Sequence, residues 1–467
     1  MPVDHHNTQN LRWTMNQRWT MKGIYRNRFS FLSTGVLSVF LALTLFQIQK
    51  SGQDNLYDPV ALFLTWQQDP TTTMTIDWHT KPEEDRLTRV QYKKPGEDHW
   101  NEVMGDYHPF PHTERMIHRV ELTGLQPETT YRFRFGEDSK SYKFRTMPAN
   151  LHRPLRFATG GDTLPREGFQ MMNKTAMQYD PDFMVWGGDL AYGNGDPARI
   201  KDYWYPWFDG TKRDLIDENG RVVPIVLAIG NHEYFNKGSS TVGGNPHGSG
   251  MRLSDEEVEA YMEEHSLSDR LVTFFFDLFA FPGQPAYNVL DFGKYLSIVI
   301  LDSGHHSSIE GGQKDWLEGI LSERRDRPHV FPVYHVPAYP SARSYNSTKS
   351  IRIRENWVPL FEEYGIRVAF ENHDHAYKRT HPMLQEKIHP DGIVYMGDGM
   401  WGDPTLRRQR DSEHQNYYID RFQSARHAII VTLHGPYQHF LVVRDDGEII
   451  DEYPGAHTVA APLRMKR

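Results

Sequence analysis

Two different hydrophobic patterns divide the chain after its first fifty residues. From about Tyr57 to Met147, apolar and polar residues alternate in short runs such as 74–78 and 131–135, and Pro, Gly and charged turns separate these runs. Alternation with a period of two predicts strands that bury one face. No stretch of this segment has convincing helical spacing. Residues 56–147 are therefore predicted to form a β-sandwich domain.

The second pattern begins after residues 148–154, whose composition is that of a linker. Short apolar strands alternate there with helical stretches, which is typical of β-α units around a packed sheet. The predicted strands are Leu155–Thr159, Phe183–Trp186, Ile225–Ile229, Leu296–Leu301, Val330–Tyr334 and Val368–Phe370. Each is followed within two residues by Asp, Asn, His or Gly, and the carboxyl ends of strands in an α/β sheet form its binding crevice. These polar residues should converge within a catalytic domain predicted over residues 154–455.

The first fifty residues have the pattern of an export segment. Basic residues precede an uncharged, mostly apolar stretch from Phe29 to Gln49. A positive segment before an apolar run of roughly 20 residues suits a secretory signal or a membrane anchor. No clean cleavage site follows, so a cleaved signal and a retained membrane tether are both open for residues 1–50, with a buried core helix as a minor alternative. The protein is predicted to be exported, and to be periplasmic, extracellular or anchored facing outward.

Composition restricts the chemistry of the chain. Its 467 residues include no Cys, which removes disulfides, thiolate ligands and cysteine catalysis, so any metal must bind to N and O donors. Lys and Arg total 52 against 61 Asp and Glu, and the formal charge of −9 offers no basic surface for a nucleic-acid backbone. Nucleic acid is therefore excluded as a structural partner. An acidic chain can still take a phosphate substrate, because a metal pair supplies local positive charge.

Five short motifs at the strand ends supply N and O donors. They are Gly161-Asp162, Gly188-Asp189-Leu190-Ala191-Tyr192, Gly230-Asn231-His232-Glu233, His335 and His373-Asp374-His375. A single Gly-Asp pair after a strand is usually a turn, but five motifs in this order form a specific pattern. A two-metal hydrolase needs a carboxylate between its ions and separate ligand sets that hold them about 3.5–4 Å apart. Nitrogen and oxygen donors suit Fe, Mn or Zn.

In this order the motifs resemble those of the calcineurin-like metallophosphoesterases, and Tyr192 in Gly-Asp-x-x-Tyr resembles the purple acid phosphatases in particular. The resemblance implies an α/β domain of two mixed sheets flanked by helices, an α/β/β/α sandwich. It implies that Asp189 bridges two ions, that Asp162, Tyr192 and His375 complete the first site, and that Asn231, His335 and His373 complete the second. It also implies Fe(III) at the Tyr192 site, with Fe(II), Zn or Mn at the other. The alternative for Tyr192 is a side chain that only packs beside its strand.

The β-sandwich segment resembles a fibronectin type III domain. Leu122 to Tyr131 is similar to the signature of that family, in which the Tyr closes a tyrosine corner. Trp78 is expected in the core of this domain. Because no cluster of acids, bases or metal ligands occurs here, the domain is expected to be a spacer or one wall of a substrate cleft.

The activity implied by the resemblance is hydrolysis of phosphate monoesters through a metal-bound hydroxide, with an acid pH optimum. The expected substrates are phosphorylated small molecules or phosphoproteins. Asp189 and His232 are the predicted catalytic residues, with His232 as general acid or substrate orienter; its alternative is a hydrogen bond to a carboxylate. Glu233 is expected behind the ligands. Substrate contacts are assigned to Asn231, His232, His305, Arg343 and Tyr345, because the His residues that contact substrate in plant relatives are absent after His335.

Other interpretations stay open on the same residues. The metal site could serve a phosphodiesterase or a nucleotide-pyrophosphate hydrolase, and an adhesion or scaffold protein with a vestigial metal site is an alternative of a different class. Retention of all seven candidate ligands speaks against the latter. The segment 397–399, Gly-Asp-Gly, either lines the cleft or forms a plain turn.

A loop is predicted over Gly238 to Gly250 and an acidic helix from Ser254, followed by an aromatic stretch, Leu271 to Phe281, that could shape a substrate pocket. The pattern does not indicate an oligomeric state.

Overall fold

The structure is a computed structural model that describes residues 56–84, 86–233, 275–411 and 417–454. The predicted export segment lies outside these residues, as do the predicted loop 238–250 and the start of the predicted acidic helix. Within the described ranges, no helix is both long and apolar enough to cross a membrane.

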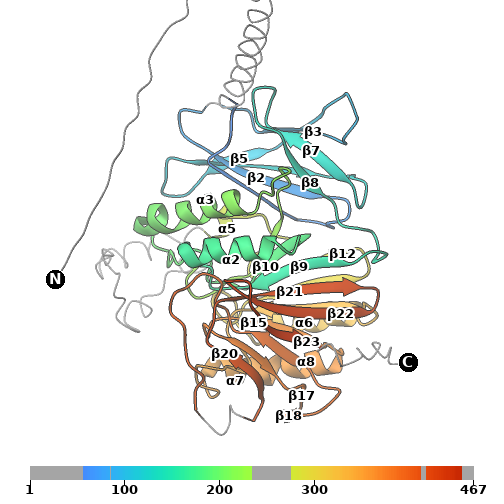
Figure 1. The fold of residues 1–467 in the computed structure, drawn as a ribbon, viewed down its shortest axis with the longest axis vertical. Helices are drawn as coiled ribbons and strands as arrows, with labels where there is room; N and C mark the ends of the chain where they lie inside the picture. Colours follow the sequence, from blue (N-terminus) through green and yellow to red (C-terminus); the bar gives the residue numbers. More distant parts are fainter. Residues whose placement is uncertain (1–55, 85, 234–274, 412–416, 455–467) are drawn as a thin grey trace, which may run out of the picture. The chain divides into compact units, whose positions relative to one another are not determined.

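Residues 57–147 form a β-sandwich of two antiparallel sheets (Figure 1). The strand order is β1-β2-β6-β5 in one sheet and β4-β3-β7-β8 in the other. Their bounds are β1 Ala61–Thr65, β2 Met74–Thr80, β3 Arg89–Lys93, β4 Asn101–Met104, β5 Asp106–Pro109, β6 Met116–Leu122, β7 Thr130–Arg134 and β8 Tyr142–Arg145. The predicted β-sandwich is confirmed.

The core of this sandwich contains the side chains that the sequence singled out. Trp78 is buried, its ring centroid lies 4.6 Å from that of Phe135, and it stacks on His118 at 5.0 Å. The backbone N–H of Gln126 donates to the Tyr131 hydroxyl at 2.9 Å, which closes the tyrosine corner. The local sequence therefore fixes both the core aromatic and the corner of this domain.

Two mixed sheets make up the rest of the described chain. The first has the order β11-β10-β9-β21-β22-β23, with β9, β10 and β11 parallel. The second has the order β12-β13-β14-β15-β19-β16-β20, with β13, β14, β15 and β19 parallel. The bounds are β9 Leu155–Gly160, β10 Phe183–Trp186, β11 Ile225–Leu227, β12 Asn288–Phe292, β13 Leu296–Leu301, β14 His329–Tyr334, β15 Val368–Glu371, β16 Tyr377–Thr380, β19 Val394–Gly397, β20 Ile419–Gln423, β21 His427–His434, β22 Tyr437–Arg444 and β23 Ile449–Tyr453, with a small ribbon of β17 Met383–Leu384 and β18 Lys387–Ile388.

The two sheets pack face to face through aromatic side chains. The ring of Phe157 on β9 lies 5.9 Å from Phe331 on β14 and 6.3 Å from Phe370 on β15. Helices cover the outer faces, with α2 and α3 over the first sheet and α6, α7 and α8 over the second (Figure 1). These helices are α2 Glu167–Met177, α3 Tyr205–Asp214, α6 Gly312–Glu323, α7 Thr348–Asn356 and α8 Val358–Glu363; shorter turns are 3-10 Pro197–Arg199, π-helical Ile200–Trp204 and α5 Phe275–Leu278. The α/β/β/α architecture is confirmed.

One predicted strand is shorter in the structure. Residues 225–229 were expected to be a single strand, but β11 ends at Leu227. Ala228 still donates its N–H to the Trp186 carbonyl at 2.8 Å, and the chain then turns at Gly230 toward the third motif. Ala228 and Ile229 are buried apolar residues, so their composition resembles a strand although they already belong to the turn.

The β-sandwich packs on both mixed sheets and on α3 through apolar side chains. Phe63 on β1 stacks on Phe208 of α3 with ring centroids 5.4 Å apart. Trp66 lies 6.0 Å from Phe183 on β10 of the first sheet and 5.7 Å from Phe292 on β12 of the second. None of the predicted site residues comes from the sandwich.

A buried histidine makes the stability of the sandwich sensitive to acid. Burial lowers the pKa of His118 to about 4, and its two ring nitrogens hydrogen-bond Thr80 at 2.8 Å and Thr88 at 2.7 Å. Between about pH 6.5 and 4, His118 is protonated in the unfolded chain, where its pKa is the usual value of about 6.5, but stays neutral in the folded chain. The free energy of unfolding should therefore fall as the pH drops from about 6.5 to 4.

We expect His118→Gln to lose less stability than the wild type across that pH range, because the amide does not titrate and can still bond both Thr hydroxyls. Thermal unfolding midpoints measured between pH 4 and 7.5 check this, with His434→Gln, an exposed position at the end of β21, as the control. Parallel pH profiles for wild type and His118→Gln would contradict it.

Candidate metal centre

The predicted ligands lie in turns directly after the strand ends, and most of these turns are strained. Asp162 follows β9, Asp189 follows β10, and His373 follows β15. Positive φ angles occur at Asp162 (58°), Asp189 (53°), Tyr192 (62°), His373 (79°) and His375 (57°). A non-glycine residue in this region costs on the order of 1–3 kcal/mol and usually marks a site where function demands the geometry. Five of the seven predicted ligands carry this signature.

The first predicted set of ligands converges on one point. The Tyr192 hydroxyl lies 3.1 Å from Asp162 Oδ1 and 3.3 Å from His375 Nε2, and His375 Nε2 lies 3.0 Å from Asp162 Oδ1. Donors at about 2.1 Å from one ion, at right angles to each other, are about 3 Å apart. The triangle formed by Asp162, Tyr192 and His375 therefore has the dimensions of a shared cation site.

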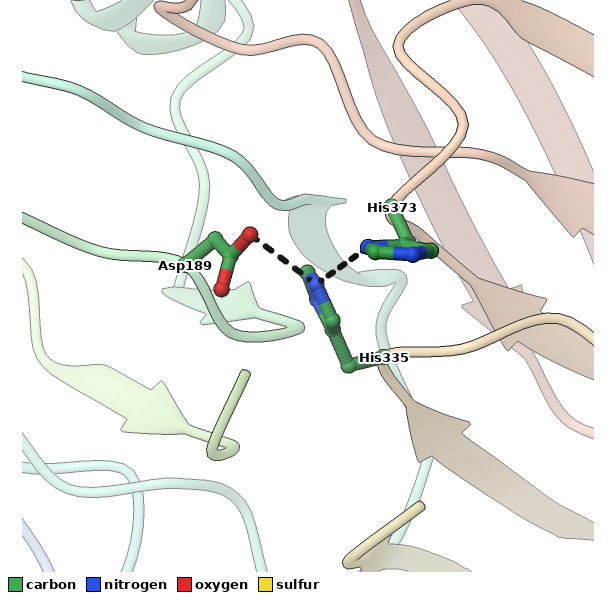
Figure 2. Close-up of side chains that lie close together, drawn as sticks. All are labelled: Asp189, His335 and His373. Atoms are coloured by element: carbon green, nitrogen blue, oxygen red, sulfur yellow. Dashed lines mark hydrogen bonds and ion pairs between the residues drawn. The ribbon is translucent and has the colours of Figure 1, made fainter. Parts of the chain in front are cut away.

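The second predicted set converges beside the first, around His335. Its Nε2 atom lies 3.1 Å from Asp189 Oδ2, 3.1 Å from His373 Nδ1 and 3.3 Å from Asn231 Oδ1. Figure 2 shows Asp189, His335 and His373 approaching one another from three separate strand ends. Their donor atoms all lie within 4.8 Å of one another, close enough to hold a metal ion together. The first and second sets are neighbours, because the backbone N–H of His373 donates to Asp162 Oδ2 at 3.0 Å.

The electrostatics of the cluster favour a bound cation. Burial would raise the pKa of Asp189, but the neighbouring His335 and His232 hold it below its ordinary value. Burial would likewise lower the pKa of His335, but Asp189 and Asp162 raise it to about 9. Asp189 Oδ2 is fully buried and accepts no hydrogen bond of good geometry, although His335 lies 3.1 Å away as an ion-pair partner. An underbonded buried carboxylate oxygen among imidazoles fits a metal pair with N and O ligands.

Backbone carbonyls orient the imidazole rings of the ligands. His335 Nδ1 lies 3.0 Å from the Gly187 carbonyl and His375 Nδ1 lies 3.2 Å from the Thr405 carbonyl. A carbonyl only accepts, so each Nδ1 carries a proton and each Nε2 is the ring atom turned toward the cluster. The ring orientation is therefore fixed by the protein, and each Nε2 could bind a metal once its own proton leaves.

Glu233 holds the second and third motifs together from behind. Its carboxylate accepts N–H groups from Asp189 at 2.8 Å, Leu190 at 2.7 Å and Gly230 at 2.7 Å. Burial and the charge of Asp189 raise the pKa of Glu233 to about 8. These contacts agree with its expected place behind the ligands and give it a structural task, which is to fix the backbone that carries Asp189.

His232 lies beside the ligands with one face partly exposed. Its backbone N–H donates to Asp189 Oδ1 at 2.7 Å, its ring stacks on Tyr192 at 4.2 Å, and its Nε2 lies 3.8 Å from Asp189 Oδ2. Its Nδ1 bonds the side-chain oxygen of Asn194, a residue that the sequence did not single out. In the sequence, Asn194 stands only in a Gly-Asn-Gly motif, which predicts a turn and no contact with His232. The structure confirms the turn, with φ of 58° at Asn194. Asn194 is an amide, so the alternative of a carboxylate partner for Nδ1 does not occur.

The remaining candidates for substrate contacts fall in different places. Asn231, partly exposed, faces the second set of donors. Arg343 is 35% exposed and its Nε lies 3.4 Å from the His373 carbonyl, so it borders the cluster. The Tyr345 hydroxyl donates to Glu386 at 2.5 Å, and the Arg354 guanidinium lies 3.6 Å from the centre of the Tyr345 ring. Both contacts of Tyr345 are therefore with residues outside the two donor sets. His305 is buried, with its ring 5.6 Å from that of His335.

Comparison with known proteins agrees with this geometry. Residues 59–146 match the family model described as purple acid phosphatase, N-terminal domain, and residues 166–377 match that of the calcineurin-like phosphoesterases. Purple acid phosphatase 23 of Arabidopsis thaliana is 25% identical over 71% of this chain and 72% of its own length. The solved purple acid phosphatase from yellow lupin seeds has a TM-score of 0.65 at 18% identity, covering 84% of this chain and 73% of that one, which shows a shared fold.

The chain thus contains a purple acid phosphatase N-terminal domain and a calcineurin-like phosphoesterase domain. An uncharacterized protein of Mycobacterium tuberculosis is also similar, at 26% identity over 69% of this chain. The chain spans about three fifths of that relative's length, 62%. The family implies a dinuclear metal centre, and the two sets of donors described above provide the positions for it.

Behind the ligands, this metallophosphoesterase-like chain has a buried ionic network that sequence reasoning missed. Lys378 is completely buried and pairs with Glu371 at 2.6 Å and Asp398 at 3.0 Å. Glu371 also accepts the Tyr334 hydroxyl at 2.6 Å. The network joins β14, β15, β16 and the end of β19, and it includes the two strands, β14 and β15, that lead to His335 and His373. Its only sequence signal was the position of Lys378 three residues after His375.

Asp374, between the two ligand His residues, points away from the donors. Its Oδ2 atom accepts N–H groups from Ser341 at 2.7 Å, Ala342 at 2.6 Å and Arg343 at 3.0 Å. This carboxylate therefore anchors the loop that follows the fourth motif, and it places Arg343 next to the centre.

The Gly397 to Gly399 turn belongs to the centre, since a side chain at Gly399 would collide with a ligand. Gly399 has φ of 67°, and an added Cβ would lie 1.7 Å from Asp162 Oδ2 and 2.9 Å from the His373 backbone nitrogen. Of the two interpretations of this turn, the structure favours the one in which the turn lines the site.

Gly399→Ala should therefore displace the Asp162 carboxylate and reduce metal content and phosphoesterase activity by about 10- to 100-fold, the range for losing a group that orients a metal ligand. Gly365→Ala is the matched control, because Gly365 has a similar φ of 72° and an added Cβ meets no atom within 4 Å. Metal analysis and hydrolysis rates of the two variants test this. Equal losses in both would mean that backbone strain alone is responsible.

Proposed function

We propose that the chain hydrolyses phosphate monoesters at a dinuclear metal centre, as an acid phosphatase does. The observation that carries the proposal is the convergence of seven N and O donors into two adjacent sets, with neighbouring donor atoms 3.0–3.3 Å apart. The family's chemistry supports phosphoester hydrolysis at a metal centre. Preference for monoesters is the finer part of the proposal.

Bound metal ions would supply an activated water and positive charge for the phosphoryl oxygens. The chain's own residues would then hold the ester and deliver a proton. His232 has its Nδ1 fixed by Asn194, so its Nε2 is directed to the centre, 3.8 Å from Asp189 Oδ2. We assign to it the protonation of the leaving-group oxygen or the orientation of the substrate. Arg343 and Asn231, beside the donors, are assigned to the phosphate.

The same proposal assigns Fe(III) to the set that contains Tyr192 and Fe(II), Zn or Mn to the other. Burial and the charge of Asp162 raise the pKa of the Tyr192 phenol far above its usual value of 10. A cation within bonding distance would have to offset both effects for the phenolate to form, and the charge of a trivalent ion would offset them most.

Tyr192→Phe should abolish any visible phenolate-to-iron absorption band of the oxidised, iron-loaded protein, because the phenolate is the source of that band. An absorption spectrum with metal analysis of wild type and variant measures this. The absence of the band from iron-replete oxidised wild type would instead point to a Mn or Zn phosphoesterase.

Asp189→Ala should lower the hydrolysis rate of p-nitrophenyl phosphate by more than about 100-fold, since it removes a ligand itself and not merely a group behind one. Asp315→Ala, at an exposed carboxylate on α6, is the control and should keep the wild-type rate. Two outcomes would favour the scaffold interpretation: an unchanged rate in Asp189→Ala, or a wild type that binds no metal.

The main rival within the same chemistry is a phosphodiesterase or nucleotide-pyrophosphate hydrolase. Comparing p-nitrophenyl phosphate with its bis ester across pH 4 to 9 separates the two. A higher kcat/KM for the monoester, with an acid optimum, supports the proposal. A higher value for the diester would replace it.

The proposed substrates are phosphorylated small molecules or phosphoproteins that the enzyme would hydrolyse outside the cytoplasm. The support for export is the basic and apolar pattern of residues 1–50. Fractionation of cells that express the full chain, followed by N-terminal sequencing, would distinguish a cleaved signal from a retained membrane tether.

A further inference from the structure

A partly buried lysine stands at the edge of the metal centre without a carboxylate partner. Lys349 lies in the first turn of α7, and its Nζ donates to His305 Nδ1 at 2.9 Å. Across the described residues, this is the single hydrogen bond of the ammonium, and no carboxylate lies within 4.0 Å of it. An ammonium group has three N–H donors. Two of them are therefore available to a ligand.

His305 holds this lysine in place. Since its Nδ1 accepts from Lys349, its Nε2 carries the proton and donates to Ser303 Oγ at 3.1 Å. Ser303 Oγ in turn accepts the backbone N–H of Val336 at 2.9 Å, directly after the ligand His335. The imidazole of His305 is buried and packs 5.6 Å from that of His335. A continuous chain of hydrogen bonds thus links Lys349 to the backbone of a metal ligand.

The charge of Lys349 is only weakly compensated by the protein. Burial lowers its pKa to about 8, opposed by the charges of Asp302 and Asp189. Asp302 does not reach the ammonium, because its carboxylate is taken up by the backbone N–H groups of His305, His306 and Ser307. The ring of His305 alone separates the ammonium from the ligand His335, since it bonds Lys349 and lies 5.6 Å from the His335 ring. Desolvating a cation without a counter-ion is unfavourable, and an anion bound at the centre would remove that cost.

We propose that Lys349 binds the phosphoryl group at the metal centre, with its ammonium donating to a non-bridging oxygen of the phosphate. His305 acts as the positioning residue that aims it, which gives His305 an indirect part in substrate binding instead of the direct contact expected from the sequence. The inference rests on the proposed function, since it names a residue that recognises the substrate of that same centre.

The test is isothermal titration calorimetry of metal-loaded protein with inorganic phosphate, together with KM and kcat for p-nitrophenyl phosphate. Lys349→Met should weaken phosphate binding by about 10- to 100-fold, the range of a hydrogen bond to a charged group, and raise KM more than it lowers kcat. Lys349→Arg should recover most of the affinity. Arg352→Met is the matched control on the same helix, because Arg352 is 52% exposed and pairs with Glu310 at 3.5 Å.

Stability and metal content separate binding from a structural role. Lys349→Met should keep its metal and its unfolding temperature, because methionine fills the space without a desolvated charge. If Lys349→Met unfolds or loses metal, Lys349→Gln, which retains a donor to His305, must still weaken phosphate binding. Unchanged phosphate affinity in either folded variant overturns the inference, as does a loss of affinity that only follows a loss of metal.

The two proposals fail in different ways. If the wild type binds phosphate through Lys349 but hydrolyses no phosphoester, the proposed function fails and the lysine assignment stands. If the wild type hydrolyses monoesters and Lys349→Met binds phosphate as tightly as the wild type, only the lysine assignment fails.

Discussion

The buried carboxylate of Asp189 is the constraint on which the centre depends. It sits at the end of β10 with almost no exposure to solvent, and its own backbone is in a left-handed turn. A carboxylate in such a place stays ionised only if cations and N–H donors surround it. The protein provides the His232 N–H on one oxygen and the His335 ring on the other. Every other part of the centre is arranged around this charge.

The turns that carry the donors are unfavourable on their own and are held by the interior behind them. Phe157, Phe183, Phe331 and Phe370 fill the space between the two sheets and fix the strands on which the turns depend. At the strand ends, Glu233 and the Lys378 network bind the backbone with charged hydrogen bonds in a low-dielectric setting. Apolar packing between the sheets thus stabilises the strands, and the buried ionic groups fix the backbone of the turns that carry the donors.

Charge is distributed unevenly between the ligands and the groups around them. Asp162 and Asp189 lie inside the cluster, while Arg343 and Lys349 lie at its border. Carboxylates inside suit cations, and cations at the border suit an anion that approaches them. The same arrangement would therefore suit the proposed metal pair and a phosphate group bound beside it.

The sequence by itself determined the two fold classes, the tyrosine corner and the positions of seven candidate donors at strand ends. These features depend on local patterns, namely strand periodicity, turn residues and short motifs at strand ends. The sequence could not determine which side chains from distant parts of the chain contact one another. Asn194 at His232, Lys378 between Glu371 and Asp398, and Lys349 at His305 carry no local signal, because each contact joins residues 7 to 44 positions apart. Strand pairing within each sheet and the docking of α7 decided those contacts, while the packing of the two sheets brought the candidate donors of β9, β10 and β11 to those of β14 and β15.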